Sequence, residues 1–114
     1  MSFSVTFRDA AHDVRIVAPA GDLDAHTAPE FEAALQHAMA AGDVRLVVDA
    51  SGLAYVSSAG VGVFMACLDP ARDAGGDLKV AALSDRVRDV FDLLGVHEVL
   101  EVTPTVDDAV AAFP

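Results

Sequence analysis

The first two regular stretches along the chain alternate apolar and polar residues, which is the period of a half-buried β-strand. The apolar positions are Phe3, Val5 and Phe7 in the first stretch and Val14, Ile16 and Ala18 in the second. A short polar segment from Asp9 to Asp13 separates them, and the second stretch ends near Gly21. Two such strands joined by a short turn predict an antiparallel hairpin.

The rest of the chain alternates helical and strand patterns. The expected helices cover residues 27–42, 58–75, 84–95 and 105–113, and the expected strands cover residues 44–48, 78–82 and 99–102. The segment 44–48 is almost wholly apolar, as expected for a strand that is covered on both faces. Because helices between consecutive strands act as crossovers, this order predicts an α/β fold with a mainly parallel sheet and helices packed against it.

The helix starts are marked by residues that favour the N-cap position. Thr27 stands three positions before Glu30, which is the spacing of a capping box. The expected caps of the three later helices are Ser58, Ser84 and Thr105. Each of the first three helices is followed by a glycine, as is common at helix ends.

Pro70 conflicts with the helical pattern in which it stands. Its nitrogen cannot donate to the carbonyl of Ala66, and its ring crowds the same turn. We expect a kink or break between Ala66 and Pro70, with the apolar part from Val61 to Leu68 still packed on the sheet. The competing outcome is a smooth helix to Ala74 whose missing hydrogen bond faces solvent.

Composition narrows the class of protein. The chain has 114 residues, of which 54% are hydrophobic, so disorder is excluded and a single domain over residues 1–114 is expected. Eighteen acidic residues against seven Lys and Arg give a formal net charge of −11, which argues against nucleic acid as a partner and favours partners with basic patches. The absence of a signal-peptide pattern and of a long apolar run predicts a cytoplasmic protein without membrane insertion.

The sequence contains no motif of a known catalytic or metal site. There is no GxxxxGK[ST] loop, no GxSxG around the serines and no HExxH. The four histidines, which are scattered and expected to be solvated, are His12, His26, His37 and His97. Cys67 lies on the apolar stretch of a helix, where a small buried side chain is the better interpretation than a nucleophile. We therefore expect no enzyme, no cofactor and no metal ion.

One segment combines a buried strand, a short loop and two serines at a helix start. From the periodicity alone, Ser58 is interpreted as an N-cap. The same geometry permits a second interpretation, because a hydroxyl at a helix N-terminus lies beside unpaired backbone N–H groups and the positive end of the helix dipole. A phosphate added there would be tolerated by the fold.

Four stretches of the chain resemble the STAS domain family, and specifically its bacterial anti-sigma-factor antagonists. They are the segment from Asp49 to Gly62, the GDLDAHTA stretch from Gly21 to Ala28, the segment from Arg88 to Val96, and the glycine pair Gly75-Gly76. The resemblance spans nearly the whole chain in one order. It implies the STAS fold: a single mixed, mainly parallel sheet of four or five strands, with helices packed mostly on one face.

The resemblance also implies a function and its site. In this family the serine that opens the second helix, here Ser58, is phosphorylated by a partner serine kinase of the histidine-kinase-like ATPase type, which is also the anti-sigma factor. The unphosphorylated antagonist binds that kinase and frees the sigma factor, and a serine phosphatase resets the switch. The implied partner-binding residues are Asp22, Asp24, Ser57, Ser58, Ala59 and Gly60.

Two positions depart from the best-known members of the family, which have an acidic residue where this chain has Ser57 and a hydroxyl residue where it has Ala59. Asp22 and Asp24 are also open to the interpretation of solvated loop acids. The alternative function is a non-switching STAS interaction subunit, such as a stressosome-like scaffold component or the STAS subunit of a lipid transporter.

Overall fold

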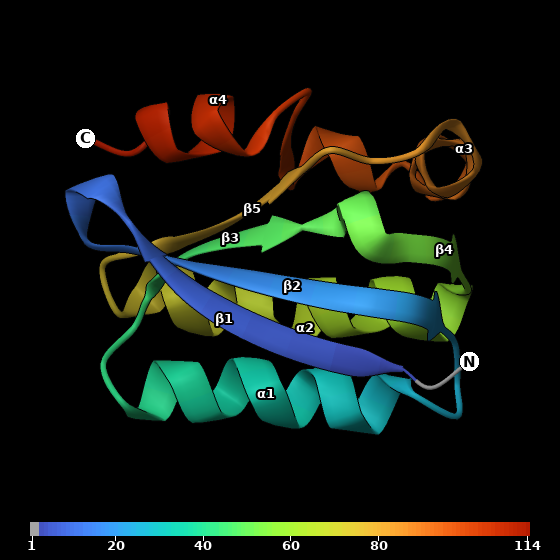
Figure 1. Cartoon of the computed structure of the whole chain (residues 1–114), viewed down its shortest axis with the longest axis horizontal. Helices are drawn as coiled ribbons and strands as arrows, with labels where there is room; N and C mark the ends of the chain where they lie inside the picture. Colours follow the sequence, from blue (N-terminus) through green and yellow to red (C-terminus); the bar gives the residue numbers. More distant parts are fainter. Residues whose placement is uncertain (1–2) are drawn as a thin grey trace.

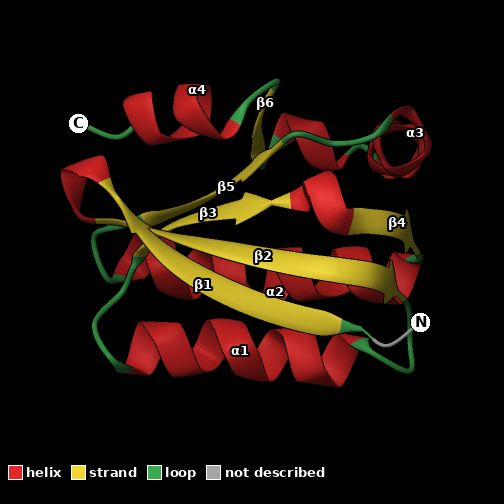
Figure 2. Ribbon diagram, viewed as in Figure 1, coloured by secondary structure: helices red, strands yellow, loops and turns green. Residues whose placement is uncertain are grey.

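The computed structural model describes residues 3–114 (Figures 1 and 2). Its strands are β1 (Ser4–Ala10), β2 (Val14–Leu23), β3 (Arg45–Asp49), β4 (Leu53–Val56), β5 (Asp77–Ala81) and β6 (Glu101–Thr103). Its α-helices are α1 (Ala28–Ala40), α2 (Ser58–Asp73), α3 (Asp85–Leu94) and α4 (Val106–Ala111), and three single 3₁₀ turns lie at Ala11–Asp13, Ala50–Gly52 and Val96–Glu98.

The strands form one mixed sheet, as predicted. The order is β1-β2-β3-β5-β6, and β4 pairs with β2 beyond the end of β3. Strands β1 and β2 form the predicted antiparallel hairpin, while every other strand pair in residues 3–114 is parallel. The long strand β2 therefore has two parallel neighbours in turn, β3 along its first half and β4 along its last residues (Figure 1).

Three helices contribute to the larger core, which confirms that the helices pack mostly on one face. Phe31 of α1, Phe64 of α2 and Phe91 of α3 are at most 1% exposed. The ring centroids of Phe31 and Phe64 are 5.2 Å apart, and those of Phe64 and Phe91 are 5.5 Å apart in an edge-to-face arrangement. Aromatic pairs at these separations add to the stability gained by burial alone, so this row of rings ties α1, α2 and α3 together.

Helix α4 covers part of the other face of the sheet (Figure 1). Its apolar residues join a second, smaller core whose buried members are Val14, Ile16, Val47, Ala81, Ala109, Val110 and Phe113. The ring of Phe113 lies between two cations, with Arg45 Cζ at 5.0 Å and Lys79 Nζ at 4.7 Å from its centroid. Arg45 Nη2 also donates to the carbonyl of Pro114 at 2.6 Å, so the end of the chain is held on the sheet by apolar packing and by cations together.

The sheet has six strands where four or five were expected. The additional strand is β4, in a segment that was interpreted as a loop. In β4 the buried residues are Leu53 and Val56 and the exposed ones are Ala54 and Tyr55, so the residues do not alternate as they do in β1. A strand of four residues without alternation carries no signal of period two.

The expected break at Pro70 is wrong. Helix α2 is continuous from Ser58 to Asp73 with Pro70 inside it. The side chains of Ala66 and Pro70 are both exposed, so the missing hydrogen bond lies on the solvent side of the helix, where water can satisfy the free carbonyl. The helix ends at Asp73, one residue before the end at Ala74 in the competing expectation.

Candidate partner-binding site around Ser58

The pairing of β2 with β4 brings together the two segments that carry the predicted site residues. Asp22 lies opposite Tyr55 and Leu23 opposite Val56 in the parallel register. One residue further on, the backbone N–H of Ser57 donates to the carbonyl of Leu23 at 2.9 Å. The loop that follows β2 and the first turn of α2 are therefore neighbours at one end of the molecule (Figure 1).

Ser57 caps helix α2, which corrects the prediction that Ser58 is the cap. Ser57 has extended backbone angles, φ −100° and ψ 174°, and its hydroxyl accepts a long hydrogen bond from the N–H of Gly60 at 3.4 Å. Ser58 occupies the first helical position with an exposed side chain. Within residues 3–114 its hydroxyl makes no hydrogen bond, so Ser57 has a structural task and Ser58 has none.

Gly60 allows the start of α2 to lie directly against the end of β2. A Cβ atom at this position would stand 2.7 Å from the carbonyl oxygen of Leu23 and 2.9 Å from Cγ2 of Val56. Gly60 is buried, so its contribution is the close approach itself rather than a side-chain contact. Its neighbour Ala59 is exposed beside Ser58.

Asp24 organises the loop between β2 and α1. Its Oδ1 accepts hydrogen bonds from the backbone N–H groups of His26 at 2.9 Å and Thr27 at 3.2 Å. These bonds, first that from Thr27 and then that from His26, hold the pKa of the Asp24 carboxyl below its ordinary value. Asp24 is therefore an ionised, half-buried group close to the start of α2.

The predicted capping box at Thr27 is not formed. Thr27 has helical backbone angles, φ −99° and ψ −15°, and its side chain does not cap α1. Its hydroxyl instead donates to the carbonyl of Asp22 at 2.7 Å and accepts from the N–H of Asp24 at 3.0 Å. A capping side chain needs an extended backbone, which Ser84 and Thr105 have, and those two predicted caps are confirmed.

Asp22 is the second acidic residue of this site. It is the exposed penultimate residue of β2, opposite Tyr55 of β4. Asp22 lies within the strand, whereas Asp24 lies beyond its end in the loop before α1. The outer surface of the site is thus formed by the exposed Asp22, Ser58 and Ala59, with the half-buried Asp24 and Ser57 between them.

The start of α2 suits a negative charge. The free N–H groups and the positive end of the helix dipole favour one at this place. No side chain of residues 3–114 hydrogen-bonds the Ser58 hydroxyl.

Sequence reasoning missed one contact beside this site. Arg86 of α3 lies over the ring of Tyr55, with Cζ 5.5 Å from the ring centroid. Tyr55 is 36% exposed and stands two residues before Ser57. A cation–π contact between residues this far apart in sequence depends on the pairing of β4, so no local pattern could have indicated it.

The titratable groups elsewhere form no metal site in the described residues, since no three His, Cys, Asp or Glu side chains of residues 3–114 gather as ligands. The side chains of all four histidines are exposed, as expected.

Cys67 is buried, with 2% of its surface exposed. This burial, and to a lesser degree the nearby charge of Glu32, raises the pKa of its thiol to about 11. Its packing confirms the interpretation as a small core residue.

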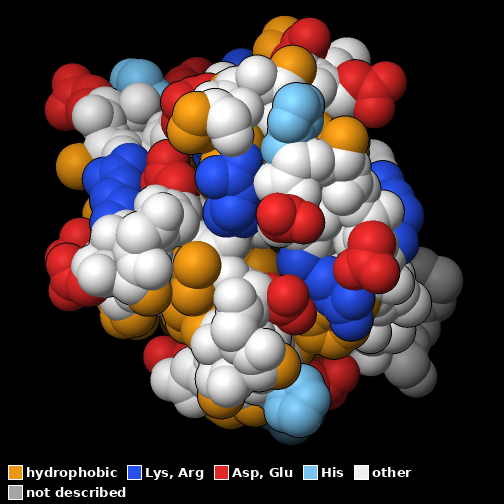
Figure 3. Space-filling view, turned by 90° about the vertical axis from the view of Figure 1, so that its left-hand side faces the viewer, with side chains coloured by type: hydrophobic (Ala, Val, Ile, Leu, Met, Phe, Trp, Pro, Cys, Tyr) orange, Lys and Arg blue, Asp and Glu red, His pale blue; other side chains and the backbone are white. Residues whose placement is uncertain are grey.

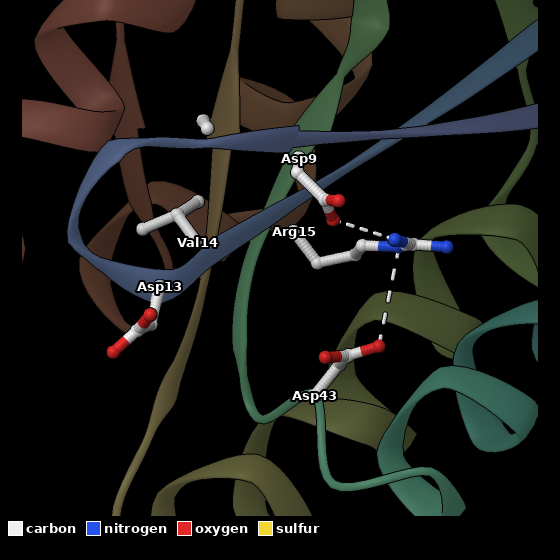
Figure 4. Close-up of a pocket in the computed structure, with 6 residues that line it drawn as sticks. Asp9, Asp13, Val14, Arg15 and Asp43 are labelled. Carbon is white, nitrogen blue, oxygen red and sulfur yellow. Dashed lines mark hydrogen bonds and ion pairs between the residues drawn. The ribbon is translucent and has the colours of Figure 1, made fainter.

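Side chains of both charges are scattered over the opposite end of the molecule, where the hairpin turns and β3 begins (Figure 3). A hollow of about 300 Å³ lies there beside Arg15, which contacts Asp9 at 2.6 Å and Asp43 at 3.9 Å (Figure 4). The lining carries three carboxylates, those of Asp9, Asp13 and Asp43, against the single guanidinium group of Arg15, which two of them already contact. We assign it no function.

No helix of residues 3–114 combines the length and the apolar character that a bilayer span requires.

Comparisons with known proteins agree on one family. A family model described as "Mlab, STAS domain" matches residues 5–102. The chain is similar to a protein of Listeria monocytogenes named anti-sigma-B factor antagonist, with 28% identity over 102 residues that cover 90% of each chain. Two solved structures are also similar. An anti-sigma factor antagonist from Mycobacterium paratuberculosis has 28% identity and a TM-score of 0.88, with 97% of this chain and 93% of that one covered.

The second structure is the Bacillus cell fate determinant SpoIIAA in its phosphorylated form. It has a TM-score of 0.71 and 18% identity, with 97% of this chain and all of that chain covered. At this identity the likeness concerns the fold.

Proposed function

This chain belongs to the STAS domain family, and from that premise we propose that it is an anti-sigma-factor antagonist that acts by binding another protein. The related proteins named anti-sigma-B factor antagonist and the solved antagonist from Mycobacterium paratuberculosis support this role. In this role the chain acts in the cytoplasm, where sigma factors meet RNA polymerase. In this role it performs no catalysis of its own.

Ser58 is the switch. The observation that carries this proposal is the contrast between two adjacent serines: Ser57 is engaged as the helix cap, whereas Ser58 is exposed and makes no hydrogen bond within residues 3–114. A phosphate on Ser58 would add about two negative charges at the positive end of the α2 dipole. The modification would therefore change the surface that a partner meets without opposing the fold.

The partner-binding surface consists of Asp22, Asp24, Ser57, Ser58 and Ala59, with Gly60 beneath it. The two carboxylates and the hydroxyl lie at one end of the molecule because β2 pairs with β4. A partner that reads this surface presents donors or basic groups to it, in keeping with the net charge of −11. A phosphate on Ser58 would add bulk and about two negative charges where the partner fits the bare hydroxyl, and it would face acidic groups of the kinase or its nucleotide phosphates, so the partner would be released.

The proposed partner is an anti-sigma factor that is also a serine kinase of the histidine-kinase-like ATPase type. Unphosphorylated chain binds it and frees the sigma factor, and transfer of the γ-phosphoryl group of ATP to Ser58 ends the complex. A serine phosphatase hydrolyses the phosphoserine and restores the binding form.

The second candidate function is a non-switching STAS subunit that binds a partner permanently. The departures at Ser57 and Ala59 favour it, because the residue before Ser58 is a helix cap rather than an acid. In that case Ser58 stays unmodified and the same surface is a fixed contact.

One experiment separates the two candidates. The purified chain is incubated with ATP and the histidine-kinase-like ATPase encoded nearest to its gene, and its mass is measured. The switch predicts a gain of about 80 Da, the mass of one phosphoryl group, on the peptide that contains Ser58. Ser58→Ala should abolish the gain and Ser57→Ala should retain it. A wild-type chain that binds the ATPase but gains no mass would favour the permanent subunit, and modification of Ser58→Ala would exclude Ser58 as the acceptor.

A further inference from the structure

Helix α3 has one apolar side that the fold uses and a second that it leaves in solvent. Val87 and Phe91 face the core and are at most 1% exposed. Leu93 is 84% exposed and its neighbour Leu94 is 46% exposed, among the few large apolar side chains exposed in residues 3–114. A single exposed leucine does not by itself indicate an interface. The position of this pair relative to the site at Ser58 is therefore the relevant observation.

The exposed side of α3 begins beside that site. Arg86 and Leu93 are seven positions apart, which is close to two helical turns, so they lie on the same side of α3 and about 10 Å apart along its axis. Arg86 in turn covers the ring of Tyr55 in β4, which leads into the first turn of α2. Tyr55, Arg86, Leu93 and Leu94 define a surface, here called the α3 strip, that runs from the neighbourhood of Ser58 to the end of α3, with Asp89 and the half-buried Val90 between its two ends.

The charges around the strip indicate what kind of surface it fits. Near the leucines the exposed charges of α3 are those of Arg88, of Asp89 one turn before Leu93, and of Asp92, whose carboxylate lies 3.6 Å from Nδ1 of His97. A second copy of this chain would bring another eleven net negative charges to the contact, which opposes self-association. A protein surface with an apolar pocket bordered by Lys or Arg is complementary to both the leucines and the acids.

We propose that the α3 strip is the apolar anchor of the same partner contact that includes Ser58. This inference rests on the proposed function. Leu93 and Leu94 contribute binding affinity in both states of Ser58, and phosphorylation of Ser58 determines whether the partner is released. A large apolar side chain that inserts into a pocket is the usual centre of binding energy in an interface, whereas polar groups at its rim adjust specificity.

The test uses the full chain and calorimetric titration. The probe is the purified anti-sigma factor that binds the wild-type chain most tightly among the histidine-kinase-like ATPases of the source genome. Leu93→Ser is expected to weaken binding by about tenfold or more, with an unchanged circular dichroism spectrum because the side chain is outside the core. Binding of the wild type should also weaken as salt is raised, as expected for a basic partner surface.

Val99→Ser is the matched control. Val99 is 49% exposed, and its carbonyl accepts from Nη2 of Arg72 at 2.9 Å in the last turn of α2, at the far end of that helix from Ser58. This variant should bind like the wild type.

Two results would overturn the inference and leave the proposed function standing. One is full affinity of Leu93→Ser. The other is a wild-type dimer in sedimentation that Leu93→Ser dissociates, since the strip would then be a contact between copies. A wild-type chain that binds none of the ATPases would instead overturn the proposed function, and this inference with it.

Discussion

The backbone N–H of Ser57 and the carbonyl of Leu23 are joined by a 2.9 Å hydrogen bond between the end of β4 and the end of β2. The first turn of α2 therefore starts from a position set by the sheet. Ser58 follows Ser57 directly, and its exposed hydroxyl is presented by rigid elements rather than by a loose loop. The predictions that follow depend on this attachment.

The two adjacent serines should differ in their effect on stability. Ser57→Ala removes the cap of α2 and should lower the free energy of unfolding by about 1 kcal/mol or less, since the 3.4 Å bond to Gly60 is long. Ser58→Ala should change it by less than about 0.5 kcal/mol, because the side chain is exposed. Urea denaturation followed by circular dichroism measures both. A larger loss for Ser58→Ala than for Ser57→Ala would contradict the assignment of the cap.

Gly60 and Gly62 provide a matched pair for testing the close approach of α2 to β2. Gly60→Ala places a methyl group 2.7 Å from the carbonyl oxygen of Leu23 and should cost about 1–3 kcal/mol. Gly62→Ala meets nothing within 4 Å and should stabilise the helix by up to about 1 kcal/mol. Thermal unfolding of the two variants should shift in opposite directions. Equal shifts in the unfolding temperatures of the two variants would mean that the start of α2 is loosely packed against the end of β2.

The charge of Asp24 should stabilise the fold above the ordinary pKa of its carboxyl. Hydrogen bonds from Thr27 and His26 lower the pKa in the folded state from 3.8, so the unfolded state binds the proton more readily. The stability advantage over Asp24→Ala should be fully present above that pKa and should decline as pH falls through the lowered folded value. Carbon-detected NMR titration of Asp24 should give a midpoint below 3.8. A midpoint at or above this value would show that the loop bonds do not persist in solution.

Phe113 should stabilise the chain through both its size and its aromatic face. Its side chain is 5% exposed, with Arg45 and Lys79 on its ring. Phe113→Ala should lower the free energy of unfolding by about 3 kcal/mol or more, since it empties part of the smaller core. Phe113→Leu keeps the apolar volume and should lose about 1 kcal/mol, the contribution of the cations. Equal losses of unfolding free energy in the two variants would mean that the aromatic ring, which both variants remove, accounts for the whole stabilisation and the apolar volume for none of it.

Most of the fold could be predicted because its elements show clear periods. Phe3, Val5 and Phe7 alternate with polar neighbours, and the hairpin they predict is present. The caps Ser84 and Thr105 were correct because each precedes an isolated helix start with an extended backbone. By contrast β4 was missed, since Leu53 and Val56 are buried three positions apart and become a strand only through pairing with β2.

The candidate site was harder to predict than the fold. Two adjacent serines both suit an N-cap, and only the place where β4 ends decides that Ser57 has that position. Thr27 matched the capping-box spacing, but the carboxylate of Asp24 binds the N–H groups of the loop instead. The position of Asp22 opposite Tyr55 also could not be predicted from patterns along the chain, because it depends on the register of β2 and β4. The family resemblance indicated which residues belong to the site, whereas their arrangement in space depends on the pairing of β2 with β4.

The split pairing of β2 has a consequence for the order in which the chain folds. Strands β1 and β2 are joined by a turn of three residues, so the hairpin closes at little cost in chain entropy. The pairing of β2 with β4 joins two segments that α1 and β3 separate along the chain, and contacts across such long segments form slowly. We expect the end of the molecule that carries Ser58 to be completed late. A nascent or partly folded chain then lacks the proposed partner-binding surface, so under the proposed function only a fully folded molecule would bind its partner.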